Sequence, residues 1–141
     1  MKRVDGIEVV ESFLLKAQQI LKDDAFDIRK NFYIMRLRRS YSENNLHTNE
    51  STLLELDYEA RHVVKEIISL TVENYKETLI DNMPGKKKPF YCFIKKIKGK
   101  QVYIKFKISE EKEKQVFCVS FHFVEIDVED EELPYKKNNK K

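Results

Sequence analysis

Long apolar runs are absent from this chain of 141 residues. None approaches the roughly 18 or more residues that a membrane-spanning helix needs. The N-terminal Met1-Lys-Arg-Val-Asp-Gly-Ile7 contains no apolar stretch of signal-peptide length. We therefore expect a soluble, cytoplasmic protein with no membrane partner.

Cysteine is also scarce. The two thiols, Cys92 and Cys118, both lie in apolar runs that read as strands. This context favours reduced, buried thiols of an intracellular chain over a disulfide or a reactive thiol.

Motifs of several site classes are missing. The chain has no Cys-x-x-Cys, His-x-x-x-His or His-Glu-x-x-His, so we expect no metal site. The basic Gly85-Lys-Lys-Lys88 loop lacks the spacing of a phosphate-binding loop, and it follows a helix and precedes a strand, the reverse of the required order. We therefore expect neither nucleotide hydrolysis nor a cofactor. Ser120 and His122 are two residues apart on one strand, a spacing that disfavours a hydrolase triad.

The length fits one domain with a single core. We assign residues 1–126 to this domain. Residues 127–141 contain the acidic Glu129-Asp-Glu-Glu132 and a lysine-rich end, which predict a poorly ordered charged tail.

Hydrophobic periodicity predicts helices first and strands second, which is the α+β class. Helices are predicted over Ile7–Lys22, over one or two turns of Thr52–Leu56, over Tyr58–Leu70 with Asp57 as its cap, and from Thr71 through Ile80. An edge strand is predicted at Ala25–Ile28, and an antiparallel sheet from 90–97, 101–108 and 115–124, with Gly99 in a hairpin turn. Arg29–Arg39 fits either a helix or a strand, and Ser40–Asn49 reads as a loop. We expect the helices to pack on one face of this sheet.

The last two strands alternate with a period of two, so each should have one apolar and one polar face. The predicted core faces carry Val102, Ile104, Phe106 and Ile108 in one strand, and Phe117, Val119, Phe121 and Phe123 in the other. The opposite faces carry Tyr103, Lys105 and Lys107, and Cys118, Ser120 and His122. This predicts a wall with a phenol, two ammonium groups, a hydroxyl and an imidazole.

Such a wall has the groups for cleaving RNA without a metal. The reaction needs a base for the 2′-hydroxyl, an acid for the leaving 5′-oxygen and cations for the phosphate. We select His122, Tyr103, Lys105 and Lys76 as catalytic candidates. Lys76 interrupts the apolar side of the predicted third helix, where it either extends to water or points into a polar cleft. The simpler reading of the wall is a solvated sheet face.

Positive charge is concentrated although the net charge is only +3. No Asp or Glu occurs between Pro84 and Lys107, and such a segment attracts polyanions. The predicted RNA-binding residues are Lys86, Lys87, Lys88, Lys95, Lys107 and Ser120. A plain solvated loop explains the lysines at 86–88 equally well.

Three motifs carry a family resemblance: Leu70-Thr-Val-Glu-Asn-Tyr-Lys76, Gly99-Lys-Gln-Val-Tyr-Ile-Lys105 and Val116-Phe-Cys-Val-Ser-Phe-His122. Together they resemble the MqsR-like branch of bacterial toxin–antitoxin toxins, over roughly residues 8 to 125. The resemblance implies a RelE-like α+β fold and a metal-independent endoribonuclease that cleaves mRNA. It also implies a cognate antitoxin protein as partner.

The functional residues of the family can be matched to individual positions of this chain. The family's active-site lysine corresponds to Lys76 and its strand tyrosine to Tyr103. His122 stands where the best-known members have lysine, and an imidazole has a pKa better suited to proton transfer near neutral pH. The family's glutamine in the first strand of the sheet has no counterpart in Phe90-Tyr-Cys-Phe93. Two alternatives stay open: a module that binds nucleic acid without cutting it, and a protein-interaction module of a mobile element.

Overall fold

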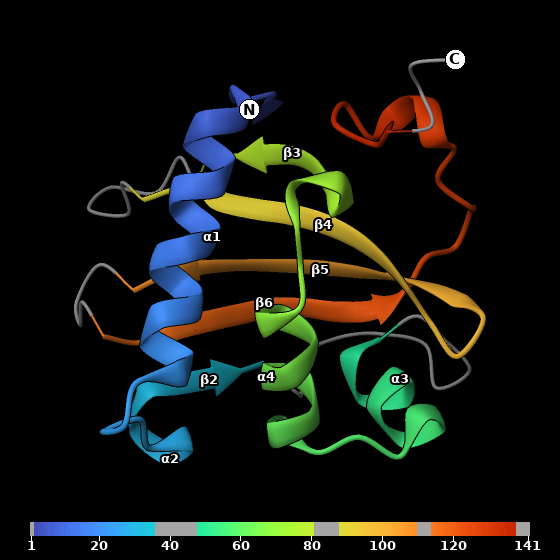
Figure 1. Ribbon diagram of the computed structural model, residues 1–141. Coiled ribbons are helices and arrows are strands. Elements are labelled where there is room, and N and C mark those ends of the chain that lie inside the picture. Colours follow the sequence, from blue (N-terminus) through green and yellow to red (C-terminus); the bar gives the residue numbers. More distant parts are fainter. Residues whose placement is uncertain (1, 36–47, 81–87, 110–113, 138–141) are drawn as a thin grey trace.

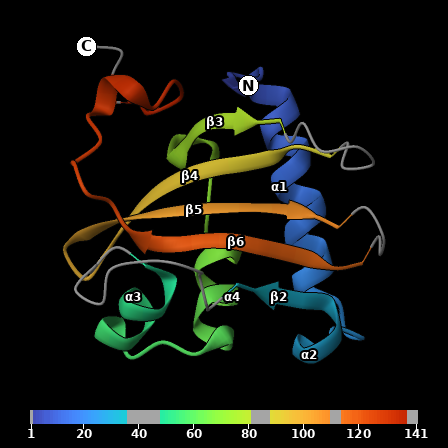
Figure 2. The same ribbon diagram turned by 180° about the vertical axis from the view of Figure 1, so that it is seen from behind.

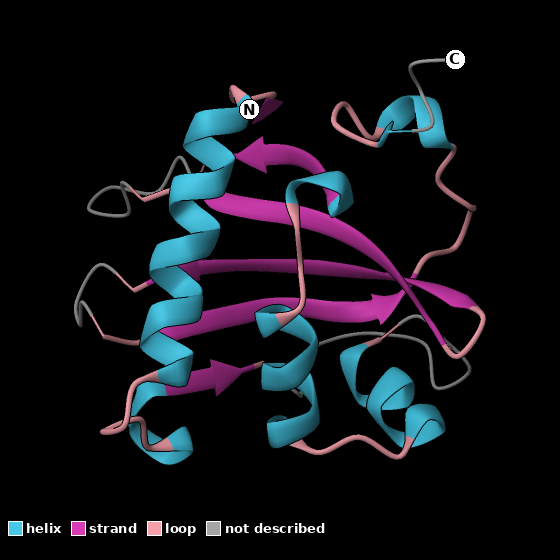
Figure 3. Ribbon diagram, in the orientation of Figure 1, coloured by secondary structure: helices cyan, strands magenta, loops and turns pink. Residues whose placement is uncertain are grey.

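The computed structural model describes residues 2–35, 48–80, 88–109 and 114–137. Within them the chain forms four α-helices and a six-stranded mixed sheet (Figures 1 and 3), which confirms the α+β class. The helices are α1 (Ile7–Lys22), α2 (Ile28–Asn31), α3 (Asn49–Leu56) and α4 (Ala60–Ile68). The strands are β1 (Lys2–Arg3), β2 (Phe32–Ile34), β3 (Tyr75–Leu79), β4 (Phe90–Ile97), β5 (Lys100–Ile108) and β6 (Val116–Phe123). No helix of this described part is long and apolar enough to cross a bilayer.

The sheet has the strand order β1-β3-β4-β5-β6-β2. Its centre consists of the three predicted strands, β4, β5 and β6, in antiparallel pairing. The predicted hairpin turn is present, with Gly99 at φ 87°, a conformation that glycine adopts without strain. The sheet is mixed because β2 pairs with β6 in parallel, which the sequence did not predict.

One face of the sheet contributes to the core together with α1 and α4. Val10, Leu14, Ala17 and Leu21 of α1 belong to one buried cluster with Val63, Val64 and Ile67 of α4 and Val102, Ile104 and Phe106 of β5. Figure 1 shows α1 and α4 in front of the strands, and in Figure 2 the strands lie in front of these helices. We call the sheet face turned away from α1 and α4 the distal face.

The predicted third helix is wrong. Thr71 caps a single 3₁₀ turn, Val72–Asn74, and β3 follows directly. The Asn74 side chain donates to the Ile94 carbonyl of β4 at 3.1 Å, so the turn is tied to the sheet where the helix would have continued. Pairing of β3 with β4 then overrides the local helical pattern.

The first half of the chain needs smaller corrections. A short helix, α2, begins at Ile28, and the strand of this region is β2, not the predicted edge strand at Ala25–Ile28. Helix α3 begins at Asn49 behind the cap Thr48, inside the predicted loop; residues 36–47 lie outside the described part. Asp57 ends α3 with a φ of 59° and is not the cap of α4, which is Glu59.

A β-bulge at Val119 changes which side chains of β6 reach the core. Lys105 is opposite Ser120, but the next residue, Phe106, is opposite Cys118. Cys118 is therefore buried in the core and not on the predicted polar wall. Phe117 lies on the distal face, so the predicted apolar face is right for Phe121 and Phe123 and wrong for Phe117 and Val119.

The side chain of Asn49 stabilises this bulge. It is fully buried, donates to the Val119 carbonyl at 3.0 Å and accepts from the Phe121 amide at 2.9 Å. Thr52 accepts from the Phe123 amide at 3.0 Å. Side chains of α3 thus take over the edge hydrogen bonds of β6 where β2 has ended.

Residues 127–137, assigned from composition to a charged tail, contact the domain. Gln101 makes two hydrogen bonds to the backbone of Val128, and Leu133 is buried. Tyr135 stacks on Tyr75 and donates to the Asp5 carbonyl at 2.6 Å. Residues 138–141 lie outside the described part.

Candidate functional site

Tyr103, Lys105 and Lys107 lie on the distal face of β5, as the alternation predicts. The residues between them, Ile104 and Phe106, are fully buried in the core, so the other three must point to the opposite side of the strand. On β6, beyond the bulge, Ser120 and His122 are the register partners of Lys105 and Tyr103. Four of the predicted site residues are thereby brought together on two neighbouring strands.

Tyr103 and His122 are in ring contact. Their ring centroids lie 5.4 Å apart with the planes at 37°. Nδ1 of His122 lies 3.1 Å from the Phe123 carbonyl oxygen. A proton on Nδ1 would donate to this oxygen and leave Nε2 as the basic nitrogen.

The Tyr103 hydroxyl donates to Cys92 Sγ at 3.1 Å. Cys92, on the distal side of β4, is fully buried, and burial raises the pKa of its thiol to about 11. Burial also raises the pKa of Tyr103 well above its ordinary value, and the neighbouring Cys92 adds to this effect. Both groups therefore keep their protons near neutral pH, so Tyr103 is a hydrogen-bond donor and not a base.

Lys76 lies on β3, not on a helix, and two strands separate it from His122. Neighbouring strands are about 4.8 Å apart, which places the backbones of β3 and β6 about 14 Å apart. Lys76 Nζ lies 3.2 Å from Glu77 Oε1, at a bulge of β3 between Tyr75 and Glu77. The charges of Lys105, Glu77 and Lys76 all act on the pKa of the Cys92 thiol, so Cys92 lies among them.

Glu77 is a site residue that the sequence prediction missed. It is the register partner of Cys92 and contacts both Lys76 and Lys2, the latter at 3.6 Å. The available signal was its position next to Lys76. Assigning the segment to a helix concealed that Glu77 faces the same side of the sheet as Lys105.

The predicted RNA-binding lysines are not gathered in one place. Lys86 and Lys87 lie outside the described residues. Lys88 donates to the Ser109 carbonyl at 3.4 Å and lines a groove of about 450 Å³ between α1 and the sheet. Lys107 is only 4% exposed, with its ammonium 4.6 Å from the centre of the Phe90 ring.

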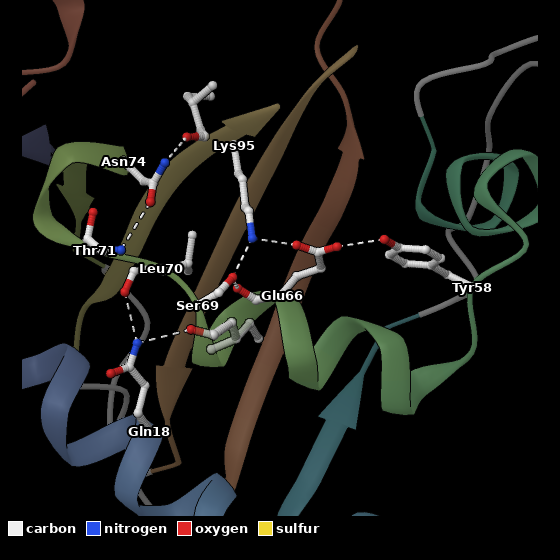
Figure 4. Close-up of polar contacts among 10 residues, drawn as sticks. Gln18, Tyr58, Glu66, Ser69, Leu70, Thr71, Asn74 and Lys95 are labelled. Atoms are coloured by element: carbon white, nitrogen blue, oxygen red, sulfur yellow. Dashed lines mark hydrogen bonds and ion pairs between the residues drawn. The ribbon is translucent and has the colours of Figure 1, made fainter. Parts of the chain in front are cut away.

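Lys95 lies on the helix side of the sheet, away from the predicted wall. Its ammonium contacts Glu66 at 2.6 Å and also bonds Ser69, both from the α4 region (Figure 4). Glu66 in turn accepts from the Tyr58 hydroxyl at 2.6 Å. Burial, with a smaller contribution from this hydrogen bond, raises the pKa of Tyr58 to about 12. The contacts of Lys95 therefore join β4 to α4.

A neighbouring amide contact in the same view joins α1 to the end of α4. Gln18 donates to the carbonyls of Ile67 and Leu70 at 3.1 and 3.0 Å (Figure 4). Ile67 belongs to the last turn of α4, and Leu70 follows the C-cap of this helix, Ser69. This contact is structural.

Both cysteines are free thiols. Among the residues that the structure describes, no group of three or more His, Cys, Asp and Glu side chains is arranged to hold a metal ion. No protein-family model matches the chain, and comparisons with curated proteins and with solved structures give no significant match.

Proposed function

We propose that the protein is an endoribonuclease that cleaves mRNA by attack of the RNA's own 2′-hydroxyl, without a metal ion. The observation that carries this proposal is the register of β5 and β6, which sets His122 opposite Tyr103 and Ser120 opposite Lys105 on the distal face. A proton-transfer group, a neutral hydroxyl donor and a cation thus lie within one short stretch of sheet. These are the groups that phosphodiester transesterification needs.

His122 is the proposed proton-transfer residue. As a base, its Nε2 takes the proton of the 2′-hydroxyl, and the 2′-oxygen attacks the phosphorus. The bond to the 5′-oxygen breaks, and the imidazolium returns a proton to this leaving group. The products are a 2′,3′-cyclic phosphate and a 5′-hydroxyl, so no proton is gained or lost overall.

Tyr103 and the lysines would stabilise the phosphate. The neutral Tyr103 hydroxyl can turn from Cys92 to donate to a phosphate oxygen, because its raised pKa keeps it protonated. Lys105 supplies positive charge beside it. Lys76 contributes charge from the β3 side, where Glu77 holds it, and Ser120 is a weaker candidate for a hydrogen bond. We assign Lys107 to packing against Phe90, since it is nearly buried.

We further propose a RelE-like fold and a place among MqsR-like toxins, with an antitoxin protein as partner. Support comes from the three motifs of the resemblance and from the basic segment between Pro84 and Lys107. Expression of the chain alone should slow bacterial growth, and co-expression of an adjacent small reading frame should restore it. Normal growth with the soluble, folded chain alone would argue against a toxin.

Incubation of the purified protein with single-stranded RNA tests the catalytic proposal. We expect fragments with 2′,3′-cyclic phosphate and 5′-hydroxyl ends, cleavage that persists in EDTA, and none of an all-2′-O-methyl RNA of the same sequence. Loss of activity in EDTA, or cleavage of the 2′-O-methyl RNA, would overturn the mechanism. Binding without cleavage would support the second candidate, a non-catalytic RNA-binding module, which the contact of Tyr103 with Cys92 favours.

A further inference from the structure

A row of aromatic rings crosses the distal face beside the proposed catalytic group. Tyr33 of β2 is the register partner of Phe117 of β6, and their ring centroids are 5.3 Å apart. The Phe117 ring lies 6.0 Å from that of Phe90 of β4. We call Tyr33, Phe117 and Phe90 the aromatic row.

Two lysines of β5 lie against this row. Phe117 is the register partner of Lys107, whose strand β5 runs between β4 and β6. The ammonium groups of Lys107 and Lys105 are 4.6 and 5.4 Å from the centroid of the Phe90 ring. Because Phe90 and Phe117 belong to the strands on either side of β5, their contact covers Lys107, which explains its burial. Tyr33 is 52% exposed and forms the accessible end of the row.

From these contacts we infer that the aromatic row is a base-stacking subsite for single-stranded RNA, next to the scissile phosphate. This inference rests on the proposed function and adds where the substrate is held. Nucleobases stack on aromatic side chains presented by a sheet surface. Along β5 the row lies four residues from Tyr103, about 13 Å, so one strand of RNA can reach both places.

The charge around the row favours RNA over an apolar protein segment. No Asp or Glu occurs in β4, β5 or β6, whereas Lys105 lies between the row and the Tyr103–His122 pair. An occupant must therefore offer flat rings and negative charge together. Single-stranded RNA has both, with a base and a phosphate in every nucleotide.

The chain contains no tryptophan, which provides a direct probe. In the full-length Tyr33→Trp variant, the single indole should be quenched when a 2′-O-methyl RNA that resists cleavage is added. Tyr33→Leu should weaken binding of this RNA about 5- to 150-fold, the effect of losing one stacked base. Tyr33→Phe should bind normally, since the ring is kept.

Further variants separate stacking from charge. Tyr33→Leu should leave the salt dependence of binding unchanged, whereas Lys105→Ala should reduce it by about one phosphate contact. Leu15→Ala, at an exposed apolar position of α1, is the control that should bind RNA as the wild type does. Phe117→Leu provides a second ring deletion in case Tyr33→Leu is unstable.

The outcomes distinguish the two proposals. If the wild type cleaves RNA and the Leu variants bind it with unchanged affinity, the stacking subsite is wrong and the proposed function stands. If binding depends on the Tyr33 ring but no cleavage occurs, the subsite stands and the catalytic proposal is wrong. A wild type that neither binds nor cleaves RNA overturns both.

Discussion

The surroundings of His122 suit proton transfer better than those of a fully buried histidine would. His122 is partly exposed on the distal face, and its Nδ1 lies beside the Phe123 carbonyl. Its register partner Tyr103 stays protonated because burial raises the tyrosine's pKa. At the scale of single residues, the proposed mechanism therefore gives the two groups distinct roles: the imidazole exchanges protons and the phenol donates a hydrogen bond.

Replacing His122 by alanine should lower the cleavage rate about 10²- to 10⁴-fold, the usual contribution of a general acid or base. The fold should be unaffected, because the side chain faces away from the core. His62→Ala is the matched control: this histidine accepts from the Glu59 amide at the start of α4, so its loss should reduce stability by about 1 kcal/mol and leave cleavage unchanged. Single-turnover RNA cleavage and circular dichroism measure both effects. Equal cleavage by His122→Ala and wild type would mean that His122 is not the proton-transfer residue.

At the scale of elements, the sequence was most informative where one face of an element is apolar throughout. Helix α1 and strand β5 follow their expected periods because their core faces are continuous. The alternation failed at β6, where the Val119 bulge shifts the phase. That bulge depends on Asn49, 70 residues away in the chain, whose side chain bonds the Val119 carbonyl. A contact at this separation leaves no local signal in the sequence.

The same limit applies to the candidate site. Tyr103, Lys105, Ser120 and His122 could be predicted because alternation selects one face of β5 and, beyond the Val119 bulge, one face of β6. Lys95 could not, since its strand carries lysines on both faces and only the position of Glu66 identifies its partner. Glu77 was missed because the 3₁₀ turn before β3 begins with a helix-like cap.

Two adjacent lysines of β4, Lys95 and Lys96, test whether Lys95 stabilises the fold or binds RNA. Lys95→Ala should lower the free energy of unfolding by about 1–3 kcal/mol, because it leaves the largely buried Glu66 without its charged partner. RNA affinity should not change. Lys96→Ala, at the exposed neighbouring position, should leave stability within about 0.5 kcal/mol of the wild type. Urea unfolding and RNA titration measure the two quantities, and a Lys95 variant of normal stability with weakened RNA binding would reverse our assignment.

At the scale of the whole molecule, both ends of the described chain are held at β3. Asp5 accepts from the Thr78 hydroxyl at 2.8 Å, and its amide donates to the Tyr75 hydroxyl at 2.9 Å. Tyr135 reaches the Asp5 carbonyl and stacks on Tyr75. The C-terminal segment thus shares its anchoring residues with the N-terminal strand, which ties stability to groups far apart in the sequence.

The buried thiols of Cys92 and Cys118 and the partly buried phenol of Tyr58 are acids whose neutral form is favoured by burial. Burial raises the pKa of the Cys92 and Cys118 thiols from 9.0 to about 11 and about 12, and that of Tyr58 from 10.0 to about 12. At a pH between the ordinary and the raised pKa of such a group, the unfolded chain has lost a proton that the folded chain keeps. Because the folded state then binds more protons, its stability must fall as the pH rises above about 9.

We therefore expect these three groups to leave the free energy of unfolding nearly constant below about pH 8 and to lower it from about pH 9 upward. Each such group contributes up to about 1.4 kcal/mol per pH unit. Urea unfolding at about pH 8, 9.5 and 10.5, with reductant present, measures the decline.

Since surface lysines also titrate at the upper end, the comparison that isolates a thiol is wild type against Cys118→Ala. This variant should be less stable at pH 8 because a core group is lost, yet its stability should fall less steeply with pH. Parallel curves for the two proteins would show that the Cys118 thiol does not resist ionisation in the folded state.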